Sequence, residues 1–435
     1  MALYENEICG VPYFPGVASG HLQKGANRVN AQSIVLLSQD AITAFPVLPA
    51  GFIVTEAAPF SHTLIALLGL GVPTVLITAR QAASLKQGVL LQIDGSSGKI
   101  SSDIAEVSPA ALSRYGYNRQ DKAGSTFLMA DGEAVNLCAS VRRLIAVNQA
   151  VAQGATCIGL VRSEFLLPMN GRQPNQPFYR ETCRELCEAA APLTVTFRLL
   201  DLAADKIPGW LPKSAMTGQA AGLQGVRLYH IDSVRTVVDA QLAALADLSG
   251  EFVFRLLLPF LVRPEEYVHW LSVIRQYLPD TVAVGAMAET PAAVLDIGGL
   301  LEQANFVAIG CNDLMQGLFS ADRDQPALRH YLDPYAPVLY RLLRQAAEQA
   351  GRSLPGVQLC GVLSQLQGVL PVLLGLGYRT FSIDAPFIPY FEQVIAASTQ
   401  TGCEALAAQV CAAASTYEVL EILQLPTDRH PPYLA

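Results

Sequence analysis

CIGLVRSEFLL, residues 157–167, is a short apolar run followed at once by Arg162 and Glu164. Seven further apolar runs, each separated from the next by a helical stretch, are VNLC (135–138), VTFRLL (195–200), FVFRLLL (252–258), VAVGAM (282–287), FVAIG (306–310), VQLC (357–360) and TFSI (380–383). Strands that alternate with helices build a parallel sheet. Eight such units within about 300 residues predict an α/β protein with a closed (β/α)8 barrel.

The segment before these runs has the pattern of a separate, smaller domain. Residues 1–100 carry short β-like runs, SIVLLS (33–38) and GFIVT (51–55), between Pro and Gly turns, with one helical stretch after His62. The polar stretch SRYGYNRQDKAGST (113–126) has no apolar periodicity, which is typical of a linker. We therefore predict a small α/β domain at 1–100, a linker at 101–125 and the barrel at 126–435.

Composition narrows the class of protein. A net charge of −8 and a pI near 5.3 argue against nucleic acid or an anionic membrane surface as the main partner. The longest apolar stretch, Thr63–Ile77, is broken by Gly69, Gly71 and Pro73 and is too short for a bilayer helix. We expect a cytoplasmic protein without a membrane span. The high apolar content, 51%, favours a homodimer, and nine unpatterned cysteines predict mostly reduced thiols.

Polar side chains follow the predicted strands where catalytic groups of such barrels lie. They are Arg162, Glu164, Arg198, Asp201, Glu289, Asn312, Asp313, Arg323 and Cys360. Guanidinium groups suit phosphate or carboxylate, and paired carboxylates suit Mg²⁺. Any one of these residues is as often a structural ion pair or a core thiol, and His62 alone is weak support for a site. Together they predict a site for a small, phosphorylated, anionic acid.

Several motifs resemble those of the phosphoenolpyruvate-utilising enzymes, a family that includes enzyme I of the sugar phosphotransferase system, pyruvate phosphate dikinase and phosphoenolpyruvate synthase. IGLVRSEFLL (158–167) is similar to G-L-x-R-T-E-F-L, and FRLLDLAADK (197–206) to R-x-x-D-x-x-x-D-K. GAMAETPAAV (285–294), AIGCNDLMQGLFSADRD (308–324) and QLCGVLS (358–364) resemble three further barrel motifs. FSHTLIALLGLGVPTVL (60–76) resembles the T-S-H segment of the swivelling phosphohistidine domain.

The resemblance implies a role for each matching residue. Arg162, Arg198, Arg227, Asn312 and Arg323 would bind phosphoenolpyruvate, while Glu289 and Asp313 would hold Mg²⁺. His62 would accept the phosphoryl group, and Cys360 would protonate C3 of the enolpyruvate left behind. The implied protein is a Mg²⁺-dependent phosphotransferase that moves a phosphoryl group between phosphoenolpyruvate and a histidine, with pyruvate as the other product or substrate.

The sequence is also compatible with two other functions. Phe60 and Leu68 stand where the family has Thr and Arg around the histidine, so the loop of the carrier domain is altered. A barrel-only enzyme that handles pyruvate or enolpyruvate would not need His62, and a phosphoenolpyruvate sensor would need no turnover. The residues between PYFPGVASG (12–20) and SIVLLS match no acceptor module, so we expect the acceptor to be a small molecule or a separate protein, such as a nucleotide-binding one.

Overall fold

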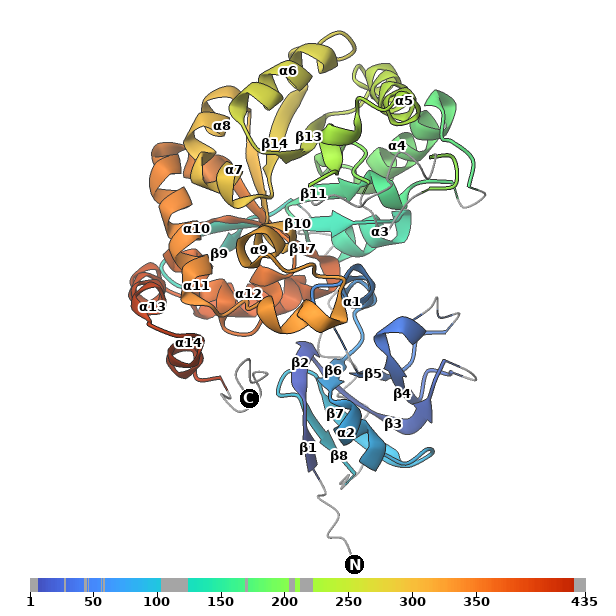
Figure 1. The fold of residues 1–435 in the computed structure, drawn as a ribbon, viewed down its shortest axis with the longest axis vertical. Coiled ribbons are helices and arrows are strands. Elements are labelled where there is room, and N and C mark those ends of the chain that lie inside the picture. Colours follow the sequence, from blue (N-terminus) through green and yellow to red (C-terminus); the bar gives the residue numbers. More distant parts are fainter. Residues whose placement is uncertain are drawn as a thin grey trace, which may run out of the picture.

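The computed structural model describes residues 7–26, 29–42, 45, 47–55, 57, 59–102, 124–168, 171–202, 208–211 and 222–425. These residues form a small N-terminal sheet with two helices and a larger barrel of strands and helices (Figure 1). Most of the predicted linker, 103–123, lies outside the described residues. The domain limits at 100 and 126 therefore stay predictions.

The small sheet has eight strands in the order β1-β8-β7-β3-β4-β5-β6-β2. The elements are β1 (Glu7–Cys9), β2 (Val11–Phe14), β3 (Val17–Lys24), β4 (Ser33–Ser38), β5 (Gly51–Thr55), α1 (His62–Leu68), β6 (Thr74–Ile77), α2 (Ala79–Ser84), β7 (Leu90–Asp94) and β8 (Lys99–Ser101). Strands β3 to β6 run parallel, and the flanking strands pair antiparallel. The runs SIVLLS and GFIVT are β4 and β5 with the predicted bounds.

Strand β4 is buried on both faces, which explains its continuous apolar run. Ile34 and Leu36 lie on one face of β4 and pack in a core made only of residues of the small domain. Val35 and Leu37 point to the other side, into a core that includes residues of α1 and continues into the barrel. This second face fixes α1 between the small sheet and the barrel.

The barrel closes because β10 pairs with both β11 and β17, and this confirms the predicted (β/α)8 architecture. Its strands are β10 (Ala134–Val141), β11 (Cys157–Arg162), β12 (Val195–Arg198), β13 (Phe254–Leu261), β14 (Ala283–Ala288), β15 (Val307–Gly310), β16 (Val357–Cys360) and β17 (Thr380–Asp384), preceded by the short β9 (Phe127–Leu128). Each of the eight apolar runs overlaps one of these strands, and four of them extend one or two residues beyond it.

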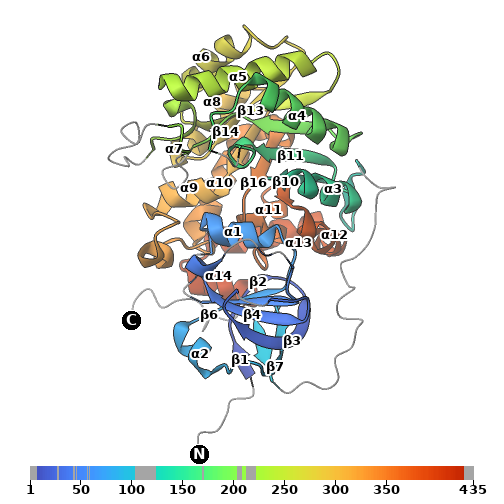
Figure 2. The same cartoon turned by 90° about the vertical axis from the view of Figure 1, so that its right-hand side faces the viewer.

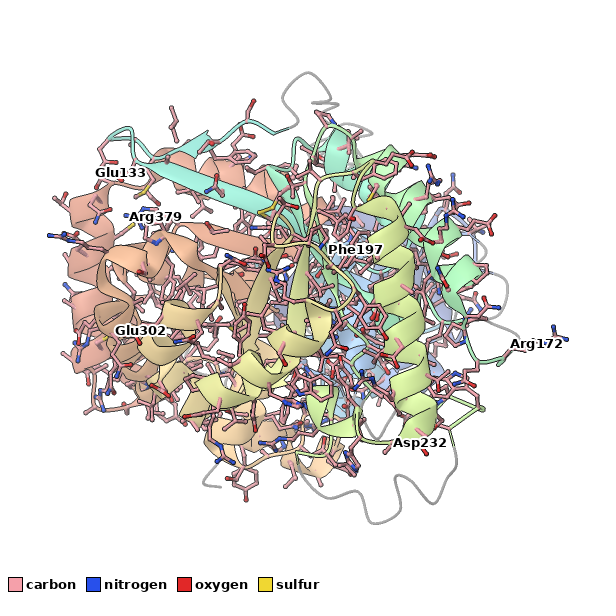
Figure 3. All side chains as sticks on the ribbon, turned by 90° about the horizontal axis from the view of Figure 1, so that it is seen from above. Glu133, Arg172, Phe197, Asp232, Glu302 and Arg379 are labelled. Carbon is pink, nitrogen blue, oxygen red and sulfur yellow. A yellow bond between two sulfur atoms is a disulfide. The ribbon has the colours of Figure 1, made fainter. Side chains whose placement is uncertain are left out.

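Helices follow the strands and cover the outside of the barrel (Figure 3). They are α3 (Leu144–Ala152), α4 (Gln176–Ala190), α5 (Asp232–Leu248), α6 (Pro264–Ile274), α7 (Pro291–Leu295), α8 (Ile297–Gln303), α9 (Cys311–Phe319), α10 (Pro337–Ala350), α11 (Val369–Gly375), α12 (Ile388–Ala397), α13 (Gln400–Ala412) and α14 (Thr416–Ile422). Figure 3 shows Phe197 inside the molecule and Arg172 at its rim. In the described part of the chain, no helix combines the length and apolarity needed to cross a bilayer.

Helix α1 of the small domain lies against the C-terminal end of the barrel (Figure 2). Arg142, the residue after β10, donates from Nη1 to the carbonyl oxygen of Ile65 in α1 at 3.1 Å. The ring of Phe14 meets that of Phe387, just beyond β17, at a centroid distance of 4.6 Å. The helix that begins with His62 is therefore docked at the carboxyl ends of β10 and β17.

Two of the nine cysteines are not reduced in the structure. Cys138 on β10 and Cys157 on the neighbouring β11 form a disulfide, which the sequence pattern did not indicate. The other seven are free, and only Cys9 among them is exposed. The expectation of mostly reduced thiols therefore holds for seven positions, and six of these thiols are buried.

Candidate active site

Strand register brings the predicted site residues together. Arg162 and Arg198 each end a strand, β11 and β12, and they are direct neighbours in the parallel ladder. Gly310 at the end of β15 and Cys360 at the end of β16 are paired in the same way. Because parallel strands end on one face, these groups converge at the C-terminal mouth of the barrel.

A small cavity that is open to solvent occupies this mouth. Its lining residues are Arg162, Glu164, Arg198, Asp201, Gln224, Met287, Glu289, Gly310, Cys311, Asn312, Asp313, Arg323, Cys360 and Gly361. All nine polar residues that the sequence analysis placed at the strand ends are among them. Of the two further residues that the resemblance implies, Arg227 is not in this lining, and the side chain of His62 lies outside what the structure describes.

Arg198 lies at the centre of the charged lining. Its Nη2 lies 2.6 Å from Glu164 Oε1, and its Nη1 lies 2.8 Å from Asp201 Oδ2 and 3.7 Å from Glu289 Oε1. Burial would lower the pKa of Arg198, but the surrounding carboxylates outweigh burial and raise it. The guanidinium is therefore a fixed positive charge held in one orientation.

Arg162 stands in a different electrostatic environment. Burial, together with the positive charges of Arg142 and Arg198, lowers its pKa to about 10. Among the described residues, the buried Nε atoms of Arg162 and Arg198 have no hydrogen-bond partner. Two adjacent guanidinium groups with unused donors form a suitable site for an anion such as a phosphate or carboxylate.

Carboxyl groups crowd the other side of the cavity. Burial, and then the charges of Asp313 and Asp201, raise the pKa of Glu289 well above its usual value. Burial likewise raises the pKa of Asp201 to about 6, although Arg198 opposes the shift. Among the described residues, the buried Oδ1 of Asp201 has no hydrogen-bond partner. Carboxyl groups this close together are stabilised by a hard cation.

The donor set fits Mg²⁺ only if other ligands complete it. Within the described ranges, no group of three or more His, Cys, Asp or Glu side chains is placed to hold a metal ion. Glu289 is 2% exposed and already accepts at Oε2 from the backbone nitrogen of Phe260 at 3.1 Å. Mg²⁺ is commonly held by one or two carboxylates plus water and substrate phosphate. Glu289 and Asp313 meet that requirement.

Two glycines that the sequence analysis did not single out shape this part of the cavity. A Cβ at Gly310 would lie 2.6 Å from the side chain of Glu289. Gly361 has a φ of +102°, and a Cβ there would lie 2.8 Å from Asn312 Oδ1. That oxygen accepts from the backbone nitrogen of Val362 at 3.0 Å, which fixes the Asn312 amide. The glycines in AIG and CGV were the signal for this close packing.

Arg227 lies beside the cavity rather than in its lining. It lies within the 3₁₀ helix η6 (Gly225–Leu228). Its Nη1 donates to the carbonyl oxygen of Gly222 at 3.1 Å, and its guanidinium lies 5.2 Å from the ring centroid of Phe260. Phe260 in turn donates to Glu289. Residues 212–221, before this turn, lie outside the described residues. In the described part of the chain, Arg227 adjoins the carboxylate side of the site only through Phe260.

His62 is the first residue of α1, and Ser61 caps the helix by accepting from the backbone nitrogen of Leu64 at 3.3 Å. Phe60 and Leu68, 3% and 1% exposed, are packed in the core shared by the two domains. Leu68 is therefore a buried apolar residue of this core, where the family motif has an arginine.

Cys360 lines the cavity and is 2% exposed. Burial raises the pKa of its thiol to about 11, against the opposing effects of a hydrogen bond from Gln358 and the charge of Arg162. The sulfur is therefore protonated at neutral pH and able to donate a proton into the cavity.

Comparisons with known proteins identify the family. Residues 118–400 match the model of the PEP-binding domain of PEP-utilising enzymes. A phosphoenolpyruvate-protein phosphotransferase of Streptomyces coelicolor is 32% identical over 94% of this chain and 73% of that protein. One from Buchnera aphidicola is 26% identical over 86% of this chain and 68% of that protein. Multiphosphoryl transfer protein 2 of Escherichia coli is 25% identical over 86% of this chain but only 47% of its own length.

The family match covers well over half of the chain and contains every residue that lines the cavity. The Streptomyces relative extends the similarity across both the small domain and the barrel. The chain belongs to the family of phosphoenolpyruvate-utilising enzymes.

Proposed function

We propose that the chain transfers the phosphoryl group of phosphoenolpyruvate to His62, with Mg²⁺ as cofactor, and passes it on to a separate acceptor. One observation carries the proposal: the helix that begins with His62 is docked on the barrel face where the arginines and carboxylates line the cavity. The relatives named phosphoenolpyruvate-protein phosphotransferase support a protein as the acceptor.

In this reaction the arginines bind and orient the substrate. Arg162, Arg198 and Arg323 offer guanidinium donors to the phosphate and carboxylate, and Asn312 offers an amide held by Val362. An imidazole nitrogen of His62 forms a bond to phosphorus while the bond from phosphorus to the enol oxygen breaks. The pyruvate enolate left behind takes a proton at C3 from the thiol of Cys360.

Glu289 and Asp313 are the residues that would hold Mg²⁺. When bound, the cation neutralises phosphate charge in the transition state. The protein's own part is to keep both carboxyl groups at the cavity wall: Phe260 fixes Glu289, and Arg323 Nη2 lies 3.4 Å from Asp313 Oδ2.

Metal binding gives the first test. We expect Mg²⁺ to strengthen phosphoenolpyruvate binding, and Asp313→Asn to weaken the Mg²⁺-dependent affinity by about 100-fold, because a neutral amide replaces a carboxylate ligand. Since the pKa of Glu289 is raised, bound Mg²⁺ should displace a proton, and affinity should rise with pH. Calorimetry in two buffers of different ionisation enthalpy measures both effects. Equal affinities for wild type and variant, with or without Mg²⁺, would refute the metal assignment.

Phosphoryl transfer gives the decisive test. Incubation of wild type with ³²P-labelled phosphoenolpyruvate and Mg²⁺ should give an acid-labile, base-stable label, and His62→Ala should take up none. Phosphoenolpyruvate binding should survive in His62→Ala, because the cavity belongs to the barrel. The exposed His269 on α6 is a matched control, and His269→Ala should label like wild type.

Other results of the labelling experiment would support one of the two alternative functions. A wild type that exchanges pyruvate protons but takes up no label would be a barrel-only enzyme. If wild type binds phosphoenolpyruvate but neither takes up label nor exchanges pyruvate protons, the protein is a sensor. The homodimer, the cytoplasmic location and the acceptor, whether a small molecule or a nucleotide-binding or other protein, stay predictions.

A further inference from the structure

A buried glutamine lies directly beneath the thiol of the site. Gln358 is on β16, two residues before Cys360, so both side chains point into the barrel. It is 3% exposed. Cys360 also belongs to a buried apolar cluster with Leu160, Leu257 and Met287. An amide in such surroundings must be satisfied by specific partners.

The amide nitrogen of Gln358 donates two hydrogen bonds. Nε2 donates to the carbonyl oxygen of Gly159 on β11 at 3.1 Å and to Cys360 Sγ at 3.1 Å. A backbone carbonyl can only accept, so its position fixes which end of the amide faces Gly159. The amide therefore cannot turn its oxygen to the sulfur, and the group that faces Cys360 Sγ is an N–H.

The absence of a side chain at Gly159 gives the amide its place. A Cβ on Gly159 would lie 3.1 Å from Gln358 Nε2 and 2.8 Å from Ser382 Oγ. The glycine thus leaves room for the amide to reach the opposite strand. The glutamine is held by the barrel backbone rather than by the thiol alone.

This geometry decides where the thiol proton points. Since Gln358 presents only a donor, Cys360 Sγ accepts on its barrel side, and its own hydrogen is directed elsewhere. Cys360 is one of the residues that line the cavity, so we take the cavity as the open direction. We propose that Gln358 is a positioning residue that aims the Cys360 thiol proton at C3 of the pyruvate enolate and stabilises the thiolate left behind. This inference rests on the proposed function.

In this step one proton passes from sulfur to carbon. The enolate electron pair forms the new C3–H bond, the S–H bond breaks, and the negative charge passes to sulfur. The Gln358 N–H then donates to a thiolate, and a hydrogen bond to a charged acceptor is stronger than one to a neutral thiol. Solvent in the open cavity returns the proton to sulfur.

Gln358→Met tests the inference, because methionine has a similar length and no donor. We expect the exchange of pyruvate methyl protons with heavy water, followed by NMR, to slow about tenfold while phosphoenolpyruvate affinity is unchanged. Alkylation of Cys360 by iodoacetamide, measured by mass spectrometry, should slow as well, because the reactive thiolate loses its hydrogen bond. If Gln358→Met does not fold, Gln358→Leu is tested in its place.

A double-mutant cycle separates positioning from a general effect on folding. In a Cys360→Ala background, Gln358→Met should cause no further loss of the residual exchange, because its effect acts through the thiol. Gln365→Met is the matched control: this buried amide donates to the Gly361 carbonyl oxygen and Asp384 Oδ2, and its loss should leave exchange within about twofold of wild type.

The outcomes distinguish the inference from the proposed function. A wild type without proton exchange would overturn the proposed function and this inference with it. An active wild type with unchanged exchange and alkylation in Gln358→Met would overturn the inference alone. Equal losses from Gln358→Met with and without Cys360 would also overturn it.

Discussion

The Arg198→Met variant is expected to unfold with a free energy about 3–5 kcal/mol below that of wild type, the usual cost of removing one partner from a buried ionic group. Arg198 is 6% exposed and lies within 4 Å of Glu164, Asp201 and Glu289. Methionine fills similar space and still meets Met287, but it leaves three carboxyl groups without their common cation. Urea denaturation followed by circular dichroism measures the loss.

A surface pair provides the comparison. Arg344 lies 3.7 Å from Glu348 on α10, with side chains 49% and 70% exposed. Arg344→Met should therefore cost about 0.5 kcal/mol or less. If Arg198→Met is no more destabilising than Arg344→Met, Arg198 does not hold the site together.

The Arg198→Met deficit should also depend on pH. The pKa values of Glu289 and Asp201 are already raised by burial, and loss of the Arg198 guanidinium raises them further. The folded variant then binds more protons than the unfolded chain, so its stability falls as pH rises through this window. We expect a larger deficit at about pH 8 than at about pH 5. A deficit that is equal at both pH values would assign the loss to packing.

The second large effect is on proton transfer. Cys360→Ala should slow the exchange of pyruvate methyl protons by about 10²- to 10⁴-fold, the usual contribution of a general acid. Phosphoenolpyruvate affinity should change little, because the thiol acts in the transition state rather than in ground-state binding. NMR in heavy water gives the exchange rate, and calorimetry gives the affinity.

Cys411 is a suitable control for the loss of a buried thiol. Like Cys360 it is 2% exposed, but it lies on α13, outside the barrel. Cys411→Ala should leave proton exchange at the wild-type rate. An unchanged rate in Cys360→Ala would place its thiol in the core rather than in the reaction.

The barrel was predictable because its signal is local. Each strand is buried on two faces and reads as a continuous apolar run, and the helices between runs have their own period. The site was predictable for a related reason: parallel strands end on one face, so residues that follow successive runs, such as Arg162 and Arg198, must meet. The sequence alone therefore determined the closed barrel, the family and most of the cavity lining.

Other features depend on distances between residues far apart in the chain. The neighbours of Arg198, the close packing at Gly310 and the seat of α1 on Arg142 follow from strand register and domain docking. The Cys138–Cys157 disulfide likewise joins two strands that only the closed sheet brings together. Gln358 reads in the sequence as one polar residue in an apolar run. Only the tertiary structure decided its role, because the carbonyl that orients its amide belongs to Gly159, on the opposite strand.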